Sequence, residues 1–380
     1  MGGKVFDCLG LRVPRMSPEV YQRMIAEVYP KLQQFFEKVV VPRDAPGKMD
    51  HGDIDFLVGG TRPQDGYLWK LVQGALGAHH HKSQGSHSFA LPHPDIEGAH
   101  VQVDIELSLG DGLPGSWEWF EWTKLMKGDA DLMQIIGIAH RPLGLTCTDQ
   151  GLHVRLEQIE PYDKKEARLF LTRDPDKALR FYGLDVDKYF QGFSSETDLF
   201  NWVAGGRFFS LEVFAQRVEK ADDRTRSAKR PMYRHFVEEY MPNVVKNNES
   251  KIWTRQEVLL ESLKTFNVQA QYDEKMAKHD REEAEKKLWE EVKATIPATD
   301  KRLKAAVRAL RRWVRFKNSK PAKLEHPLLP EQYLTWSKYV DQSNKSDVLE
   351  WVERNWQDLK SRDKAYQNTA NASSSGGVAE

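Results

Sequence analysis

Three aspartates in two short segments have the residue type and spacing of a metal-dependent phosphoryl-transfer site. Asp53 and Asp55 stand two residues apart in the segment 51–58, and Asp104 stands in the segment 101–107. Both segments alternate apolar and polar residues with a period of two, which predicts strands that bury the apolar residues and place the aspartates on the other face. If the two strands are neighbours, the three carboxylates converge at the carboxyl ends of adjacent strands.

Three carboxylates on adjacent strands are suited to binding two Mg²⁺ ions, or Mn²⁺ in their place. Two such ions lie roughly 3.5 to 4 Å apart, activate an attacking hydroxyl and neutralise the transferred phosphate. The pattern therefore predicts that Asp53, Asp55 and Asp104 are catalytic residues and metal ligands. A single Asp-x-Asp on a half-exposed strand is more often a solvated face, so the second strand is what favours the functional interpretation.

The segments around the aspartates predict helices before and between the two strands. A helix should begin at Ser17-Pro18-Glu19, where serine caps the helix and proline occupies its first turn. Its apolar period continues to Val39, with a kink or a break at Pro30. Residues 67–76 predict a second helix. The expected order is helix, strand, helix, strand.

The rest of the chain is predicted to be mainly helical. Residues 117–138 have a helical pattern, and 145–156 predict a short β-ribbon. The segment 272–292 alternates acids and bases as an exposed helix does, and the serine- and glycine-rich end predicts a disordered tail. The fold class is therefore α+β, with these expected parts: an N-terminal segment 1–29, an α/β domain 30–115, a small subdomain 116–193, a helical domain 194–365 and a disordered tail 366–380.

Composition limits the partners and the compartment. The 56 lysines and arginines balance 56 aspartates and glutamates, which excludes a uniformly basic coat for nucleic acid. Cys8 and Cys147 are too few for a disulfide framework or a cysteine zinc site, which indicates a reducing compartment. No apolar run approaches the roughly 18 to 20 residues of a membrane span. We expect a soluble, intracellular protein without a membrane partner, in the nucleus or the cytoplasm.

A local basic surface is predicted at residues 301–323, which contain ten lysines and arginines and no acid. An apolar stripe opposite the basic residues predicts an amphipathic helix. Such a helix can bind the phosphates of a nucleic acid. The alternative is a basic face docked on acidic neighbours such as 273–291. The residues expected to contact nucleic acid are Arg308, Arg311, Arg312 and Arg315.

The sequence around the aspartates resembles the family X DNA polymerases, of the DNA polymerase beta type. Pro46 to Asp55 is similar to the glycine-bearing loop and Gly-Asp-x-Asp motif of that family, and Val103-Asp104-Ile105 to the strand with its third aspartate. Downstream, Gly128-Asp129 and Gly144-Leu145 bracket a helix, and Asp149-Gln150-Gly151-Leu152 follows. This arrangement resembles the thumb of those polymerases.

The resemblance covers roughly residues 30–193 and implies a nucleotidyltransferase palm over 30–115 and a small thumb over 116–193. It implies Mg²⁺-dependent transfer of a nucleoside monophosphate from a nucleoside or deoxynucleoside triphosphate to a hydroxyl, with a nucleic acid as the expected acceptor. It gives no role to the helical domain that follows. The residues that it places at the nucleotide are Arg43, Lys48, Gly52, Gly128 and Asp129.

The chain departs from that family where the triphosphate and the sugar bind. Pro42-Arg43 stands in place of a Gly-Ser pair that holds the triphosphate, and Pro46 in place of an arginine that touches it. Leu125-Met126 and Leu132-Met133 replace residues that contact the sugar and the base. Two alternatives therefore stay open. One is a nucleic-acid-binding or scaffold protein that has lost turnover, and the other is nucleotidyl transfer to a protein or a small molecule.

Overall fold

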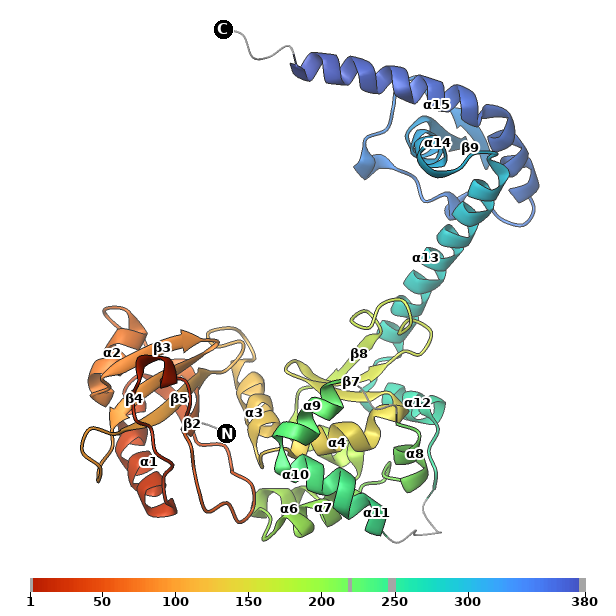
Figure 1. Ribbon diagram of the computed structural model, residues 1–380. Helices are drawn as coiled ribbons and strands as arrows, with labels where there is room; N and C mark the ends of the chain where they lie inside the picture. Colours follow the sequence, from red (N-terminus) through yellow and green to blue (C-terminus); the bar gives the residue numbers. More distant parts are fainter. Residues whose placement is uncertain (1–2, 218–220, 245–250, 376–380) are drawn as a thin grey trace. The chain divides into compact units, whose positions relative to one another are not determined.

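The computed structural model describes residues 3–217, 221–244 and 251–375 (Figure 1). The chain forms two compact units, Met1–Gln269 and Ala270–Glu380, which are called the N-terminal and the C-terminal unit below. Each is described by itself. The fold class is α+β, as the sequence predicts: a mixed five-stranded sheet and smaller sheets are followed by a mainly helical C-terminal half.

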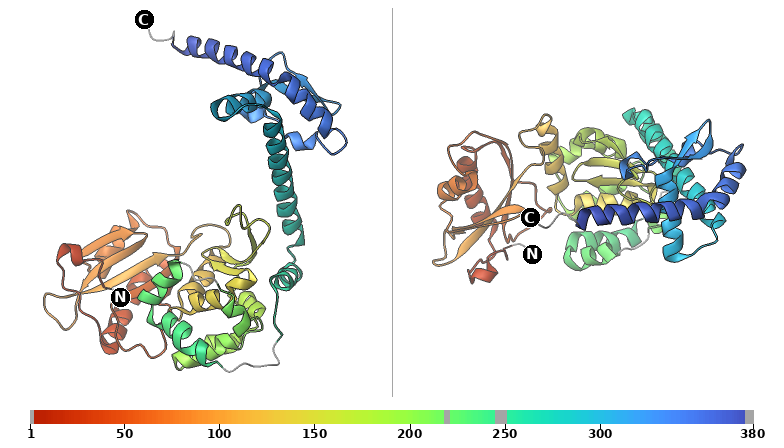
Figure 2. Two further views of the ribbon diagram at one scale, coloured as in Figure 1. Left: turned by 45° about the vertical axis from the view of Figure 1, so that its right-hand side comes forward. Right: turned by 90° about the horizontal axis from the view of Figure 1, so that it is seen from above.

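The N-terminal unit begins with a five-stranded sheet in the order β1-β2-β5-β4-β3 (Figure 1 and Figure 2). The neighbours β2 and β5 are parallel, and the other neighbouring pairs are antiparallel. The two segments that carry the aspartates are therefore adjacent strands. The five strands are β1 (Phe36–Val40), β2 (Ile54–Thr61), β3 (His80–Gln84), β4 (Ser86–Pro92) and β5 (His100–Leu107).

Two helices, α1 (Pro18–Leu32) and α2 (Leu68–Leu76), pack against one face of this sheet. Ser17 caps α1 by accepting a hydrogen bond from a backbone N–H of its first turn. Each fully buried aliphatic or aromatic side chain of such a core contributes roughly 1.5 to 3 kcal/mol. The alternation of the strands then leaves Asp55 and Asp104 on the other face. The strand residues in this core include Ile54, Phe56, Val58, Val101, Val103 and Ile105.

The first helix is shorter than its apolar spacing predicts. Helix α1 ends at Leu32 and keeps Pro30 in its last turn, and Phe36–Val40 forms strand β1. The predicted continuation of the helix to Val39 is therefore wrong. Pairing with β2 buries Phe36 and Val39 against the sheet, and this tertiary contact outweighs a helical spacing carried by only a few residues.

The rest of the N-terminal unit surrounds a three-stranded antiparallel sheet in the order β6-β7-β8. Helix α3 contacts β2 on one side and α4 and α5 on the other. The predicted ribbon is present as β6 and β7, and β8 was not predicted. The elements are α3 (Ser116–Lys127), α4 (Leu132–His140), β6 (Leu145–Thr148), β7 (Gly151–Arg155), β8 (Arg168–Thr172), α5 (Pro175–Tyr182), α6 (Val186–Gln191), α7 (Glu196–Ala204), α8 (Leu211–Ala215), α9 (Ala221–Lys229), α10 (Pro231–Arg234), α11 (Met241–Asn243) and α12 (Arg255–Phe266).

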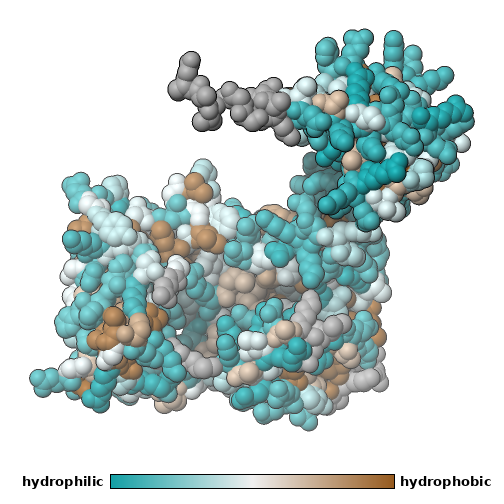
Figure 3. Space-filling view, turned by 45° about the horizontal axis from the view of Figure 1, so that its top comes forward, coloured by the Kyte–Doolittle hydropathy of each residue, from teal (hydrophilic) through white to brown (hydrophobic). Residues whose placement is uncertain are grey.

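The C-terminal unit has a helical core and a β-hairpin. Its surface in the space-filling view is mostly hydrophilic (Figure 3). Within the described residues, no helix has both the length and the apolar character needed to cross a bilayer. The elements are α13 (Gln269–Thr295), α14 (Asp300–Trp313), β9 (Val314–Lys317), β10 (Lys320–Lys323) and α15 (Lys345–Ser375). The core that they share includes Trp289, Leu310, Trp313, Trp336, Val352 and Trp356.

The boundary between the units falls inside the segment 194–365, which the sequence predicts as one helical domain. The helices up to α12 belong to the N-terminal unit because their side chains pack there. Phe266 at the end of α12, for example, lies with its ring 4.9 Å from that of Phe181 in α5. The acidic and basic helix predicted over 272–292 is present as α13.

The last helix continues into the predicted tail. Helix α15 is regular as far as Ser375, whereas composition predicted disorder over 366–380. Leu359 and Asp363 fix this helix in the core, so later turns only extend a helix that already exists, which costs little free energy. Residues 376–380 lie outside the described part of the chain.

Asp363 connects α15 to α14 through a buried carboxylate. It is 1% exposed and accepts hydrogen bonds from Arg308 Nε at 2.9 Å, Arg312 Nη1 at 2.8 Å and Trp313 Nε1 at 3.2 Å. A buried charge of this kind is tolerated only because it is paired and its oxygens are hydrogen-bonded. The contact therefore determines how α15 packs on α14.

We predict that Asp363→Ala lowers the free energy of unfolding by about 3 kcal/mol, because it leaves the guanidinium of Arg312 and the indole N–H of Trp313 without their acceptor. Urea denaturation followed by tryptophan fluorescence measures this loss. The matched control is Asp358→Ala on the same helix, whose exposed pair with Lys323 is worth at most about 1 kcal/mol. Equal midpoints for the two variants would contradict the prediction.

Candidate functional site

The structure places Asp55 directly opposite Asp104 in the parallel pair β2 and β5. Opposite residues in such a pair point to the same face of the sheet, and neighbouring strands lie about 4.8 Å apart. The two carboxylates are therefore neighbours on the face that α1 and α2 leave open. The prediction that the two aspartate-bearing strands are adjacent is confirmed.

Asp53 immediately precedes β2, and its negative charge acts on both Asp55 and Asp104. The position of the group along the strands differs from the prediction. Asp53 and Asp55 lie at the amino-terminal start of β2 and not at a carboxyl end. The reason is the register: β5 begins at His100, whereas the first residue of β2 pairs with Val103, so Asp104 in the interior of β5 is opposite the start of β2.

The negative charges of the three carboxylates repel one another. Burial, followed by the charges of Asp53 and Asp104, raises the pKa of Asp55 from 3.8 to about 7. Asp55 is exposed as a residue, but the protein around its carboxyl group limits the hydration of the charged form. Burial also raises the pKa of Asp104, whereas hydrogen bonds from Ser88 and Gln102 act in the opposite direction. A cation at this position would relieve the repulsion.

Asp104 is held by a buried glutamine. Gln102 Nε2 donates a hydrogen bond to Asp104 Oδ2 at 2.9 Å, and Gln102 Oε1 accepts one from the backbone N–H of Val5 at 3.1 Å. The other carboxylate oxygen, Asp104 Oδ1, is buried and has no hydrogen-bond partner among the described residues. A buried carboxylate oxygen without a donor is costly, and a bound cation would satisfy it.

The backbone that leads into β2 is fixed on two sides. His51 pairs with Met16 through two backbone hydrogen bonds, of 2.7 and 3.1 Å, and its ring stacks on Tyr21 with the centroids 3.8 Å apart. Gly3 lies against Gly52, so close that a Cβ at Gly3 would come within 2.5 Å of the Gly52 carbonyl oxygen. Its φ of +84° also favours glycine. Gly52, predicted at the nucleotide, is thus buried against the N-terminal segment.

Arg43 and Asp129, both predicted to contact the nucleotide, bind each other. Arg43 Nη2 donates to Asp129 Oδ2 at 2.8 Å, and Arg43 Nη1 donates to the carbonyl oxygen of Tyr189 at 2.6 Å. The Asp129 backbone N–H in turn donates to the Arg43 carbonyl oxygen at 2.8 Å. Asp129 is buried and follows Gly128, the residue that ends α3. These contacts give Arg43, Gly128 and Asp129 a structural role in joining the loop to α3.

Two lysines act on the charge of the aspartates. The positive charges of Lys127 and Lys48 both lower the pKa of Asp55, against the larger effects that raise it. Lys48 also pairs with Asp44, and Lys127 Nζ lies 2.6 Å from Glu106 Oε2. Lys48 was predicted from the sequence and Lys127 was not. No local motif marks Lys127, because its proximity to the strands depends on how α3 packs across β2.

The donor chemistry of this face fits a hard divalent cation. Asp53, Asp55 and Asp104 offer only carboxylate oxygens, which Mg²⁺ prefers, and the unpartnered Asp104 Oδ1 is a ready ligand. Within the described residues, no three histidine, cysteine, aspartate or glutamate side chains converge closely enough to hold an ion as they stand. The carboxyl groups would therefore have to turn toward a shared ion.

The four arginines predicted to bind nucleic acid differ in their contacts. Arg308 and Arg312 are committed to Asp363, Arg311 lies over the ring of Trp289 at 4.7 Å, and Arg315 is exposed on β9. The predicted docking of basic residues on an acidic neighbour is thus present for two of them. The acid is in α15 and not in the segment 273–291.

The predicted basic helix is also shorter than expected. Helix α14 ends at Trp313, and the later basic residues of 301–323 lie on the hairpin of β9 and β10. Asn318 and Ser319 at its turn have φ of +50° and +58°, which suits the two-residue turns of hairpins. Arg315, Lys317 and Lys320 on this hairpin are exposed. Among the described residues, the exposed and unpaired cations of the segment therefore include those of the hairpin, besides Lys301 and Lys304 at the start of α14.

Comparison with known proteins does not assign the chain to a family. No protein-family model matches it, and no curated protein matches it. The functional conclusion therefore depends on the residues and on the geometry described above.

The raised pKa of Asp55 predicts an unusual dependence of stability on pH. Between about pH 4 and pH 7 the folded protein keeps a proton here that the unfolded chain has released, so stability falls as pH rises through this window. Asp55→Asn removes the titrating group. We expect it to be more stable than the parent above pH 7 and close to it below pH 4.

Denaturant midpoints measured from pH 4 to pH 8 test this expectation. Asp65→Asn, an exposed aspartate in the loop after β2, is the matched control and should follow the parent at every pH. A stability difference between Asp55→Asn and the parent that does not change with pH would contradict the assigned pKa.

Proposed function

We propose that the chain is a divalent-metal-dependent nucleotidyltransferase with a catalytic core of the DNA polymerase beta type. The main observation that supports the proposal is the placement of Asp55 opposite Asp104 on adjacent parallel strands, with Asp53 beside them. In this proposal the five-stranded sheet with α1 and α2 is the palm, and residues 116–193 are the small thumb.

The proposed reaction is the attack of an acceptor hydroxyl on the α-phosphorus of a nucleoside or deoxynucleoside triphosphate, which forms a phosphate ester and releases pyrophosphate. Asp53, Asp55 and Asp104 would hold two Mg²⁺ ions, or Mn²⁺. When bound, such ions supply activation of the hydroxyl and neutralisation of phosphate charge. The protein itself positions the ligands: Gln102 orients Asp104, and the packing of Gly3 on Gly52 fixes the start of β2.

The cations around this face also support an anionic substrate. Lys48 and Lys127 lie close enough to the aspartates to influence their ionisation. With the metal ions they would favour the triphosphate at this position. Arg43 is not included among the nucleotide contacts, because its guanidinium donates to Asp129 and to Tyr189.

The proposed acceptor is a nucleic acid, held in part by the hairpin of the C-terminal unit. Arg315, Lys317 and Lys320 are exposed there, and their side chains make no ion pair with the described residues. Lys317 and Lys320 are direct partners across the two strands, which concentrates positive charge at the end of the hairpin. Such a surface binds phosphates without reading base sequence.

One alternative function has an observation in its favour. Pro42-Arg43 stands where the similar polymerases hold the triphosphate, and the structure engages Arg43 within the protein. A nucleic-acid-binding or scaffold protein that keeps the fold without turnover would have the same features. Transfer to a protein or a small molecule is a variant of the proposed reaction with another acceptor.

We predict that Asp53→Asn and Asp104→Asn each lower nucleotidyl transfer by about a thousandfold, because they remove ligands from the ions that stabilise the transition state. The assay offers each labelled triphosphate with Mg²⁺ or Mn²⁺ to a mixture of oligonucleotide, protein and small-molecule acceptors. Asp65→Asn is the control and should keep full activity. Absence of transfer by the folded parent protein with every acceptor would favour the scaffold alternative.

We predict that replacing Arg315, Lys317 and Lys320 by glutamine weakens nucleic-acid binding equally for all sequences. The slope of log K against log salt should become shallower by roughly 0.7 to 0.9 for each phosphate that the variant no longer binds. The matched control replaces Lys278, Lys286 and Lys293 of α13, which lie beside acids of their own helix. If both triple variants change the slope by the same amount, the hairpin is not the binding surface.

A further inference from the structure

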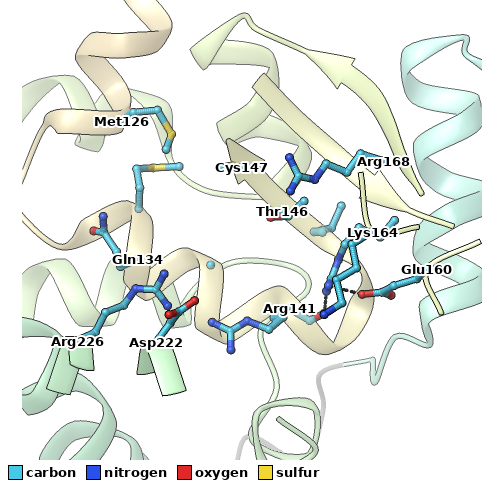
Figure 4. Close-up of a pocket in the computed structure, with 14 residues that line it drawn as sticks. Met126, Gln134, Arg141, Thr146, Cys147, Glu160, Lys164, Arg168, Asp222 and Arg226 are labelled. Carbon is cyan, nitrogen blue, oxygen red and sulfur yellow. Dashed lines mark hydrogen bonds and ion pairs between the residues drawn. The ribbon is translucent and has the colours of Figure 1, made fainter. Parts of the chain in front are cut away.

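A pocket of about 480 Å³ lies in the N-terminal unit and includes no residue of the five-stranded sheet (Figure 4). It is large enough for a small-molecule ligand, since such sites commonly measure about 300 to 1,000 Å³. Its walls come from α3, α4 and the turn after it, β6, β7, β8 and its preceding loop, and α9. The pocket is therefore distinct in position from the aspartates of β2 and β5.

Basic side chains dominate the polar lining of the pocket. Five of them line it, against two acids, Glu160 and Asp222. They come from separate elements and enter the same pocket from several sides (Figure 4). A surface that follows a nucleic-acid backbone would instead spread its cations along a groove. The five are Arg141, Arg155, Lys164, Arg168 and Arg226.

Arg226 pairs with Asp223 at 3.0 Å, and two further cations, Arg141 and Arg155, are fixed by internal ion pairs. Arg141 donates two hydrogen bonds to Asp223, at 2.6 and 2.9 Å, and Arg155 Nη1 donates to Glu160 Oε1 at 2.6 Å. Arg155 Nη2 also donates to the carbonyl oxygen of Arg141 at 2.8 Å. These side chains are only 19% and 14% exposed, so they form a rigid and partly dry wall.

Two other cations are unengaged. The side chains of Lys164 and Arg168 make no hydrogen bond or ion pair with the described residues, and both residues are exposed. Burial, together with the charges of Arg255, Arg141 and Arg168, acts to lower the pKa of Arg155. The cations thus repel one another, and an anion between them would be stabilised.

The opposite side of the pocket has an unsatisfied polar atom beside apolar groups. Gln134 Oε1 is buried and has no hydrogen-bond partner among the described residues. Met126 lies on the same side of the pocket (Figure 4), and Met133 also lines the pocket. A ligand that fills the pocket would therefore meet cations from several sides and, beside Arg226, an amide that needs a partner (Figure 4).

We propose that this pocket binds a compact ligand that carries several phosphate groups. Guanidinium groups match phosphate oxygens with paired N–H donors, and those of Arg168 are unengaged, as is the ammonium group of Lys164. Arg141 and Arg155, although paired within the protein, add positive charge to the wall behind them. The volume of about 480 Å³ and the convergence of cations on it favour a small polyphosphorylated molecule over a polymer. Its scaffold can be a cyclic polyol or a linear chain of phosphates. The inference does not depend on the aspartates or on nucleotidyl transfer.

Calorimetric titration of the full chain in metal-free buffer tests the proposal. The probes are inositol hexakisphosphate for the cyclic scaffold, tripolyphosphate for the linear one, and a short single-stranded oligonucleotide. We expect at least one of the two small polyphosphates to bind, and the tighter of them identifies the scaffold. Without metal ions, a triphosphate group cannot bind through the carboxylates of the aspartates. The titration therefore tests the pocket alone, and its outcome does not depend on whether the protein transfers nucleotides.

The variant that tests the site replaces Lys164 and Arg168 by glutamine. Both residues are exposed and unpaired, so folding should be unaffected, and the affinity for the polyphosphate should fall about tenfold or more. The control replaces Lys177 and Arg180 of α5, which carry the same charge on an exposed face and should leave the affinity unchanged. Equal reductions in affinity for both variants, or binding of the oligonucleotide alone, would overturn the proposal.

Discussion

The structure of the candidate site depends on a pair of like charges held on neighbouring strands. Asp55 and Asp104 are direct partners across β2 and β5, and Asp53 adds a third charge at the start of β2. Like charges opposite one another destabilise a sheet. Burial of apolar residues on the other face holds the two strands together in spite of the repulsion. The protein therefore keeps an arrangement that a divalent cation would stabilise.

Other contacts hold this arrangement in place and relieve the repulsion only in part. Gln102 satisfies one oxygen of Asp104 and leaves the other without a donor. The ion pair of Arg43 with Asp129 joins the loop before β2 to the end of α3, and α3 brings Lys127 toward the aspartates. Each contact fixes a proposed metal-binding carboxylate or a nearby charge before a ligand binds. Such preorganisation is the usual requirement of a binding or catalytic site.

Much of the site could be predicted from the sequence because strand alternation is a local property. The period of two around Asp55 and Asp104 was enough to predict two strands with their carboxylates on one face. It could not show the register, which placed the group at the start of β2. The ion pair of Arg43 could not be predicted for a related reason: its partner Asp129 is 86 residues away, and only the tertiary fold brings them together. The apolar spacing before Val39 predicts a helix, but Phe36–Val40 forms strand β1 because it pairs with β2.

The most direct test of the central claim is calorimetric titration of the full chain with Mn²⁺ at pH 6 and at pH 8. If the aspartates form a cation site, Mn²⁺ should bind, and binding at pH 6 should release a proton, because the pKa of Asp55 is about 7. At pH 8 the binding of Mn²⁺ should release no proton. The substitution Asp104→Asn should abolish Mn²⁺ binding at both pH values. Binding that is absent in the parent, or equal in Asp104→Asn, would contradict the assignment of these carboxylates as metal ligands.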